Sequence, residues 1–148
     1  MSLGGNHRFS PLEPDPILFD PAQTGDFAKE LAEAARQQQV PPWCSWIAWL
    51  DAAPVAMGGF KGPPAPDGTV EIGYLTFANR QGQGHATAIA GFLIGEARAH
   101  GVARVIAHTL PETNASTRVL EKNGFVRDGM GHDDDVGEVW RWRLDAPA

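Results

Sequence analysis

Cysteine is almost absent from this sequence, because Cys44 is the only one among 148 residues. One cysteine forms no intramolecular disulfide, and no pair of cysteine and histidine residues has the spacing of zinc ligands. These absences exclude a disulfide-stapled secreted domain and favour the reducing cytoplasm. No neighbour in the sequence would activate the thiol, so we interpret Cys44 as a small apolar filler rather than a nucleophile.

Positive charge and long apolar runs are also scarce. The chain has 12 lysines and arginines against 18 aspartates and glutamates, a net charge of −6, so we expect no nucleic-acid partner. The apolar stretches at 46–50 and 86–94 are far shorter than the ~20 residues that cross a bilayer. Residues 1–8 lack the apolar core of a signal peptide, and Met1–Leu3 is interpreted as a remnant of an expression vector. We therefore expect neither a membrane partner nor export.

The remaining composition, with 43% apolar and 20% charged residues, is typical of one compact domain, here 1–148. Apolar runs bounded by turn residues predict strands near Phe9 and at 46–50, 55–61, 69–77, 102–110, 125–130 and 136–144. Apolar residues at helical spacing predict helices at 26–35 (with Thr24 as N-cap), 84–100 and 114–123. One long helix between two strands allows those strands to pair in parallel. The expected fold class is α+β, or mixed α/β.

A glycine-rich segment, Asn79–Ala86, joins the strand at 69–77 to the long helix. Glycines let the backbone turn tightly and expose N–H groups, and the start of a helix favours negative charge, so the segment could bind a pyrophosphate. Glycines also cap helices for purely structural reasons, and that alternative stays open. The segment lacks the lysine of a Walker loop and the third glycine of a dinucleotide fingerprint, which disfavours both of those classes.

This segment resembles the signature Q/RxxGxG/A of the GNAT superfamily, the acetyl-CoA-dependent N-acetyltransferases, through Gln81, Gly84 and Ala86. A later stretch, Pro111–Phe125, resembles the second motif of that family, NxxSxxxxxKxGF, in a looser form. The resemblance spans Val70–Gly129 and is greatest to the branch of the ribosomal-protein N-terminal acetyltransferases.

The resemblance implies a central mixed sheet flanked by helices, whose middle strands, 69–77 and 102–110, splay apart to admit acetyl-CoA as co-substrate. Main-chain groups at the end of the first strand would hold the pantetheine arm, and the glycine segment would bind the pyrophosphate. Asn114 would bind the arm near its thiol, or else serve only as the N-cap of the short helix. The implied cofactor-binding residues are Leu75, Thr76, Phe77, Gln81, Gly82, Gln83, Gly84, His85, Ala86, Thr87 and Asn114.

Transfer of an acetyl group to an amine needs a base for the amine and a proton for the departing thiolate, but no covalent enzyme intermediate. Glu71 resembles in placement the general base of the histone-acetylating members, and is equally well a solvent-facing strand residue. His108 could relay a proton through water or be a structural histidine, and Ser116 could donate to the thiol. Many members have a tyrosine acid where this chain has Leu120.

These observations predict an acetyl-CoA-dependent N-acetyltransferase that acts by direct attack in a ternary complex. The alternative is a non-catalytic acyl-CoA-binding sensor or interaction module, because Leu120 replaces the usual acid. The acceptor would be an amine-bearing small molecule or a peptide N-terminus, and a homodimer is compatible with the sequence. Three tryptophans, Trp43, Trp46 and Trp49, either line an acceptor pocket or lie in the core. His132–Asp135 is expected to be a solvated turn rather than a metal site.

Overall fold

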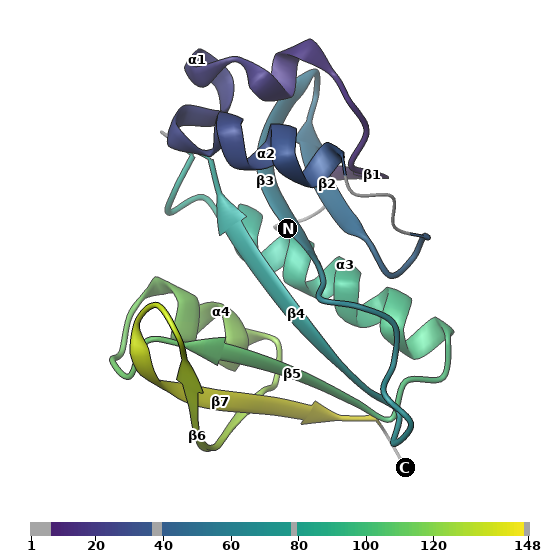
Figure 1. The fold of residues 1–148 in the computed structure, drawn as a ribbon, viewed down its shortest axis with the longest axis vertical. Helices are drawn as coiled ribbons and strands as arrows, with labels where there is room; N and C mark the ends of the chain where they lie inside the picture. The colour runs from purple at the N-terminus through teal and green to yellow at the C-terminus, as the bar shows by residue number, and fades with distance from the viewer. Residues whose placement is uncertain (1–6, 37–39, 78–79, 147–148) are drawn as a thin grey trace.

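The computed structural model describes residues 7–36, 40–77 and 80–146 of the chain, and it has a mixed α/β fold (Figure 1). Met1–Leu3 and Asn79, named above, lie outside these ranges. Within them, seven strands form one sheet in the order β1-β2-β3-β4-β5-β7-β6. The strands are β1 (His7–Pro11), β2 (Ser45–Leu50), β3 (Ala53–Phe60), β4 (Thr69–Thr76), β5 (Arg104–Thr109), β6 (Val126–Asp133) and β7 (Gly137–Asp145).

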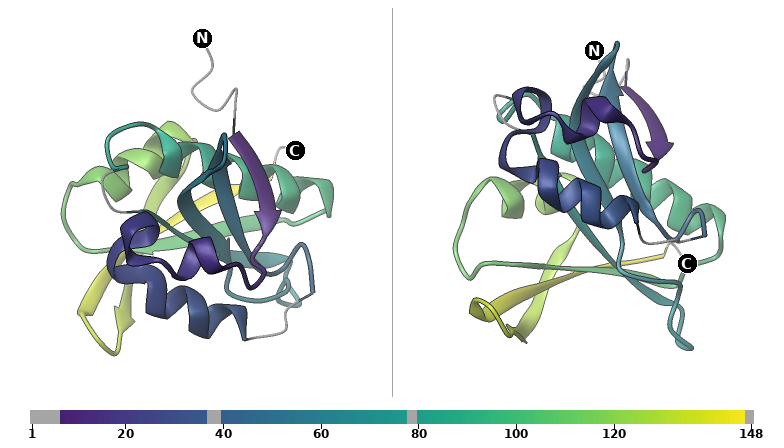
Figure 2. Two further views of the ribbon diagram at one scale, coloured as in Figure 1. Left: turned by 90° about the horizontal axis from the view of Figure 1, so that it is seen from above. Right: turned by 45° about the horizontal axis from the view of Figure 1, so that its top comes forward.

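Helices cover both faces of this sheet, as the two views of Figure 2 show. The N-terminal helices, between Pro16 and Ala35, pack on β2 and β3, whereas α3 (His85–Ala99) and α4 (Ala115–Lys122), which contact each other, lie on the opposite face. The helices are η1 (Pro16–Phe19), α1 (Pro21–Thr24), η2 (Gly25–Phe27), α2 (Ala28–Ala35), α3 (His85–Ala99) and α4 (Ala115–Lys122), where η denotes a 3-10 helix.

The N-terminal helices differ from the prediction of one helix capped by Thr24. The α-helix at this place begins at Ala28, and the buried Thr24 hydroxyl instead donates to the carbonyl oxygen of Leu18 at 2.9 Å. Two Asp-Pro pairs explain the difference, because Asp15 and Asp20 cap the short helices η1 and α1 that begin at the following prolines.

The sheet separates two apolar cores. On the α3 side, Trp46 lies edge-to-face with Phe92 at 4.8 Å between ring centroids, and Cys44 is buried nearby, as a small apolar filler should be. On the other side, Trp49 packs with Leu31 of α2, and its indole N–H donates to Ser10 Oγ. Trp46 and Trp49 are therefore core residues.

The middle of the sheet opens into a gap, as the splayed strands of the prediction require. Strands β4 and β5 pair in parallel, and their register covers only Thr69–Glu71 opposite Arg104–Ile106. Beyond that ladder β4 remains paired with β3, while β5 remains paired with β7, so the two strands diverge (Figure 1). The gap is closed at Glu71 and open beyond Thr76.

Candidate functional site

The open end of the gap faces a tight glycine turn at the start of α3. Gly82 and Gly84 have φ angles of 78° and 83°, a region that L side chains rarely adopt. Gly84 is the N-cap of α3, and no described side chain caps the helix there. The first amides of a helix have no acceptor within the helix, so they and the positive end of the helix dipole are available to an anion.

A cavity of about 200 Å³ lies between this turn and α4. Thr76, Gln81 and Gly84 line one side, and Arg118 and Lys122 line the other. Sequence reasoning missed both cations. Their spacing of four residues, which places them on one face of a helix, was the available signal, and Lys122 also matches the lysine of the second motif.

Three predicted residues of the turn are engaged in side-chain contacts. His85 is buried; its Nδ1 lies 2.8 Å from Nε2 of His7, and its Nε2 lies 3.1 Å from Oε1 of Gln83. Burial lowers the pKa of His85, and the nearby His7 and Arg80 lower it further. His85 is therefore a neutral link between the turn and β1. Gln81 donates to the carbonyl oxygen of Thr76 at 3.3 Å.

The main-chain N–H and C=O groups of β4 point alternately toward β3 and toward the gap. The Phe77 amide donates to Val55 on the β3 side, and the Glu71 carbonyl accepts from Lys61 on the same side. Because this direction alternates along a strand, the main-chain groups of Leu75 also point toward β3, whereas those of Tyr74 and Thr76 point into the gap. Of the three residues expected to offer main-chain groups to a ligand, only Thr76 has them pointing into the gap. The second such residue is Tyr74.

The closed end of the gap has a cluster of three polar side chains. His108 Nδ1 lies 2.9 Å from Glu71 Oε2, and Lys61 Nζ lies 3.1 Å from the same oxygen. The side chains of Glu71 and His108 are 25% and 28% exposed, so solvent and a substrate can reach them. Gly131 of β6 passes close to the ring, because a Cβ there would lie 3.2 Å from His108. The structure thus brings together two residues that the sequence proposed separately.

Tyr74 contacts the start of α4 on the face of the sheet opposite to that of Glu71. The Tyr74 hydroxyl lies 3.0 Å from the carbonyl oxygen of Ser116, to which it donates, and 3.2 Å from Ser116 Oγ. Burial raises the pKa of Tyr74, and its hydrogen bond with Ser116 opposes that shift. Sequence reasoning missed Tyr74 because it followed the alternate residues from Glu71 to Phe77, whose side chains point to the other face.

Asn114 has the capping role that was one of its two interpretations. Its side chain accepts from the Thr117 amide at 3.0 Å, and Thr117 Oγ1 lies 2.9 Å from the Asn114 amide. This reciprocal pair is a capping box, which fixes the first turn of α4 beside the gap. Asn114 therefore determines where Ser116 and Arg118 point.

A second cavity, of about 470 Å³, lies on the α2 side of the sheet and is lined in part by Lys61, which contacts Glu71. Its lining includes Glu30 of α2, Met57 of β3 and Lys61. Gly59 and Gly73 of the neighbouring strands also line it, and a Cβ at Gly59 would lie 2.8 Å from the backbone of β2. None of the three early tryptophans lines this cavity.

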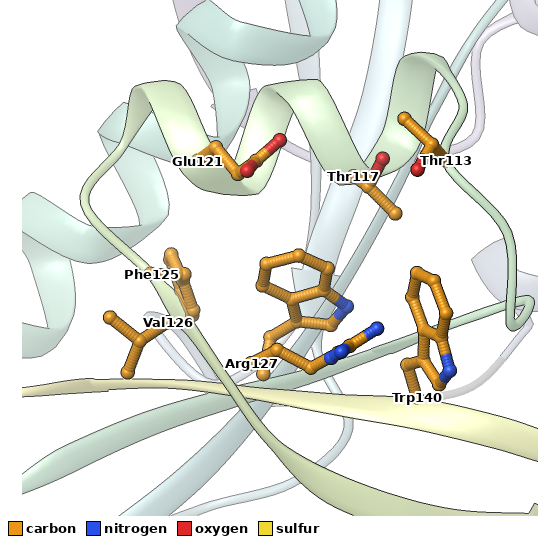
Figure 3. Close-up of a pocket in the computed structure, with 8 residues that line it drawn as sticks. Thr113, Thr117, Glu121, Phe125, Val126, Arg127 and Trp140 are labelled. Atoms are coloured by element: carbon orange, nitrogen blue, oxygen red, sulfur yellow. The ribbon is translucent and has the colours of Figure 1, made fainter.

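Figure 3 shows a third cavity, of about 410 Å³, between α4 and the β6–β7 hairpin. The Arg127 guanidinium lies over the Trp140 ring, 4.1 Å from its centroid, and Glu121 faces them from α4. This cavity shares no lining residue with the cavity beside the glycine turn, so the two are separate.

The acidic hairpin turn has the geometry of a solvated loop. Asp133 Oδ1 accepts from the amides of Asp135 and Val136, at 2.8 and 3.2 Å, and these bonds lower the pKa of Asp133. Among the described residues, no group of three or more potential ligands could hold a metal ion. No helix in those ranges is long and apolar enough to cross a membrane.

Comparison with known proteins gives one family match and several structural neighbours. Residues 7–126 match the sequence model of a family described as Acetyltransferase (GNAT) domain. No curated protein matches the chain significantly. The fold is similar to that of an N-acetyltransferase from Staphylococcus aureus Mu50, with a TM-score of 0.73 and 18% identity over 95% of this chain and 99% of that one.

Two further solved structures have a similar fold. RimJ of Mycobacterium smegmatis, in complex with CoA-disulfide, has a TM-score of 0.64 and 22% identity over 81% of this chain and 59% of its own. The ribosomal-protein-S18-alanine N-acetyltransferase of Escherichia coli has a TM-score of 0.69 and 16% identity over 94% of this chain and 93% of its own. At such identities, these neighbours share the fold alone.

Proposed function

This chain belongs to the GNAT family of acetyltransferases, and from that premise we propose that it moves an acetyl group from acetyl-CoA to a primary amine by direct attack in a ternary complex. The observation that supports this is the arrangement along one gap. An anion-binding turn lies at its open end, an exposed β4 edge runs along it, and the Glu71–His108 pair lies at its closed end. We infer a single N-acetyltransferase domain over 1–148.

The residues at the open end fit the pyrophosphate of acetyl-CoA. The amides of Gly82–Thr87 would bind it, with Arg118 and Lys122 adding two positive charges across the cavity. The pantetheine arm would pair with the main chain of Tyr74 and Thr76 like an added strand. The complex of M. smegmatis RimJ with CoA-disulfide supports this choice of ligand.

Glu71 and His108 would handle the proton of the acceptor. Both described contacts of Glu71 use Oε2, so Oε1 faces an incoming amine as the base, and His108 holds the carboxylate in place and relays the proton to water. The neutral amine attacks the thioester carbonyl, and N–H groups of the open β4 edge stabilise the oxyanion that forms. Ser116 lies on the other face, on the side where the thiolate departs.

The cavity beside α2 would hold the acceptor, because Lys61, which contacts Glu71, lines it together with Gly59 and Gly73. Its carboxylate, Glu30, and the net charge of −6 favour a cationic amine, either a small molecule or a peptide N-terminus. We also propose that the protein is cytoplasmic and forms a homodimer. Light scattering on the purified protein measures its oligomeric state.

A thiol-release assay with acetyl-CoA against a panel of amines tests the function. We expect at least one polyamine, amino sugar or peptide to accelerate release of CoA above the rate in buffer. If calorimetry shows that acetyl-CoA binds but no amine accelerates formation of the free CoA thiol, the chain is instead the non-catalytic acyl-CoA-binding module that Leu120 suggested.

A further inference from the structure

We propose that Tyr74 is the catalytic acid, donating its phenolic proton to the sulfur of CoA as the thiolate departs, while Ser116 holds the phenol in position. This inference rests on the proposed function, because it concerns the second proton of the same reaction. The contacts of Glu71 and His108 with each other commit them to the amine side. The proton for sulfur must therefore come from another group beside the gap.

Tyr74 lies where such a group is needed. It is three residues, or about 10 Å of strand, from Glu71 towards the open end. Its side chain lies on the face of β4 opposite to that of Glu71, because three is an odd number of steps along a strand. A thioester in the gap would thus have the base on one face of the sheet and the phenol on the other. In the tetrahedral intermediate, the bond to the incoming amine and the bond to the departing sulfur point in different directions from the same carbon. This arrangement therefore needs the base and the acid on different sides.

The hydroxyl of Tyr74 reaches across the gap and touches its other wall. It contacts both the carbonyl oxygen and the hydroxyl of Ser116 in the first turn of α4. The same turn begins the helix face that Arg118 and Lys122 present to the pyrophosphate cavity. An arm that runs from that cavity to Glu71 must therefore pass the Tyr74–Ser116 pair.

The state of the phenol also fits a proton donor. Burial raises the pKa of Tyr74, so the phenol keeps its proton at neutral pH. The group that faces it from α4 is Ser116, the partly buried ring packs against the apolar core on the α3 side, and no described charged side chain contributes to the shift. Leu120, one helical turn beyond Ser116, is fully buried and has no proton to give.

The step balances without any further reactant. The C–S bond breaks, its electron pair moves to sulfur, and the proton of the Tyr74 O–H bond passes to sulfur to form the CoA thiol. The phenolate then recovers a proton from water through the Ser116 hydroxyl. Glu71 and His108 release to water the proton that they took from the amine, so no net proton is gained or lost by the protein.

The composition offers a sharp test, because Tyr74 is the only tyrosine of the chain. Growth on 3-fluorotyrosine or 3,5-difluorotyrosine therefore changes this residue alone and lowers the pKa of its phenol in steps. We expect the alkaline limb of the kcat profile to move to lower pH with each added fluorine. Tyr74→Phe should lower kcat about 100-fold and leave the Kd of acetyl-CoA within about twofold. Ser116→Ala should cost about fivefold, the worth of one neutral hydrogen bond.

A fluorine NMR titration without any acceptor separates this inference from the proposed function. We expect the pKa of the fluorinated phenol to differ between the complexes with CoA and with desulfo-CoA, since the two ligands differ only at the sulfur. The Tyr74→Phe protein grown on fluorotyrosine is the control for incorporation elsewhere. Equal pKa values in both complexes, or an unmoved alkaline limb, would show that Tyr74 only ties β4 to α4. Absence of CoA binding would overturn the proposed function, and this inference with it.

Discussion

One oxygen of the Glu71 carboxylate, Oε2, contacts two neighbouring side chains. Lys61 Nζ lies 3.1 Å from it and His108 Nδ1 lies 2.9 Å from it. We expect Glu71→Gln to lower kcat about 100-fold with little change in acetyl-CoA affinity, since an amide keeps the shape but accepts no proton. Steady-state kinetics and calorimetry measure the two quantities.

The matched change at the neighbouring residue is His108→Ala, which leaves the carboxylate in place. We expect a smaller loss of kcat, about tenfold, because water can replace the relay. A larger loss at His108 than at Glu71 would make the histidine the base. Wild-type turnover in Glu71→Gln across the pH range would remove Glu71 from the mechanism.

His85 makes stability depend on pH through its buried ring. Burial lowers its pKa in the folded state, so between that value and the ordinary value of about 6.5 the unfolded chain binds more protons than the folded one. The contribution of neutral His85 is thus complete above the ordinary pKa and is lost as the pH falls below it. The slope from one such group is at most about 1.4 kcal/mol per pH unit.

Urea unfolding of the wild type and of His85→Gln at pH 7 and pH 5 measures this contribution. We expect the free energy of unfolding to fall more steeply with decreasing pH in the wild type than in the variant. His100→Gln, which changes an exposed histidine at the other end of α3, is the control and should keep the wild-type slope. Equal slopes in wild type and His85→Gln would contradict the assignment.

At the scale of elements, strands and helices with a clear apolar pattern were predictable from the sequence. The parallel partner of β4, the long helix α3 and the hairpin of β6 and β7 all lie within a few residues of their predicted ranges. The short helices η1 and α1 were missed because their signal is an aspartate before a proline rather than a periodicity. The alternation of side chains along β4 was predictable, but which of its main-chain groups face the gap was not, since the register with β3 decides it.

The start of α3 gives a test at the same scale. Gly84→Glu would place a carboxylate in the turn that we assign to the pyrophosphate, so we expect acetyl-CoA binding to be lost. Because φ is 83° there, any side chain adds strain of about 1–2 kcal/mol. Gly84→Asn is the matched control, as asparagine tolerates this conformation and has no charge. Calorimetry on both folded variants decides the assignment, and unchanged affinity in Gly84→Glu would refute it.

At the scale of the whole molecule, the negative charge should act on a cationic acceptor before it binds. The turn of Asp133, Asp134 and Asp135 lies at the tip of the β6–β7 hairpin, where the amides of Asp135 and Val136 lower the pKa of Asp133 and Lys61 adds a smaller effect. We expect kcat/KM for the active amine to fall as salt rises from 0.1 M to 1 M, because the Debye length shortens from about 10 Å to about 3 Å.

Replacing the three aspartates by asparagine should remove most of that salt dependence. Asparagine at 133 retains the side-chain oxygen that caps the turn, so the hairpin should keep its shape. A control with Asp15, Asp20 and Asp26 changed to asparagine alters the net charge equally but on the N-terminal helices. If the hairpin variant keeps the wild-type salt dependence, the turn is only a solvated loop, and Glu30 becomes the acidic residue to test.

The gap between β4 and β5 also divides the sheet into two antiparallel halves. Residues 7–76 build one antiparallel half and 104–145 the other, and the ladder between them covers only Thr69–Glu71 and its partners. Each half is contiguous in sequence, so each can open as a cooperative unit of its own in native-state hydrogen exchange. A ligand strand that spans both halves would join these units, so the substrate that is consumed in the reaction would also be the element that makes the protein rigid.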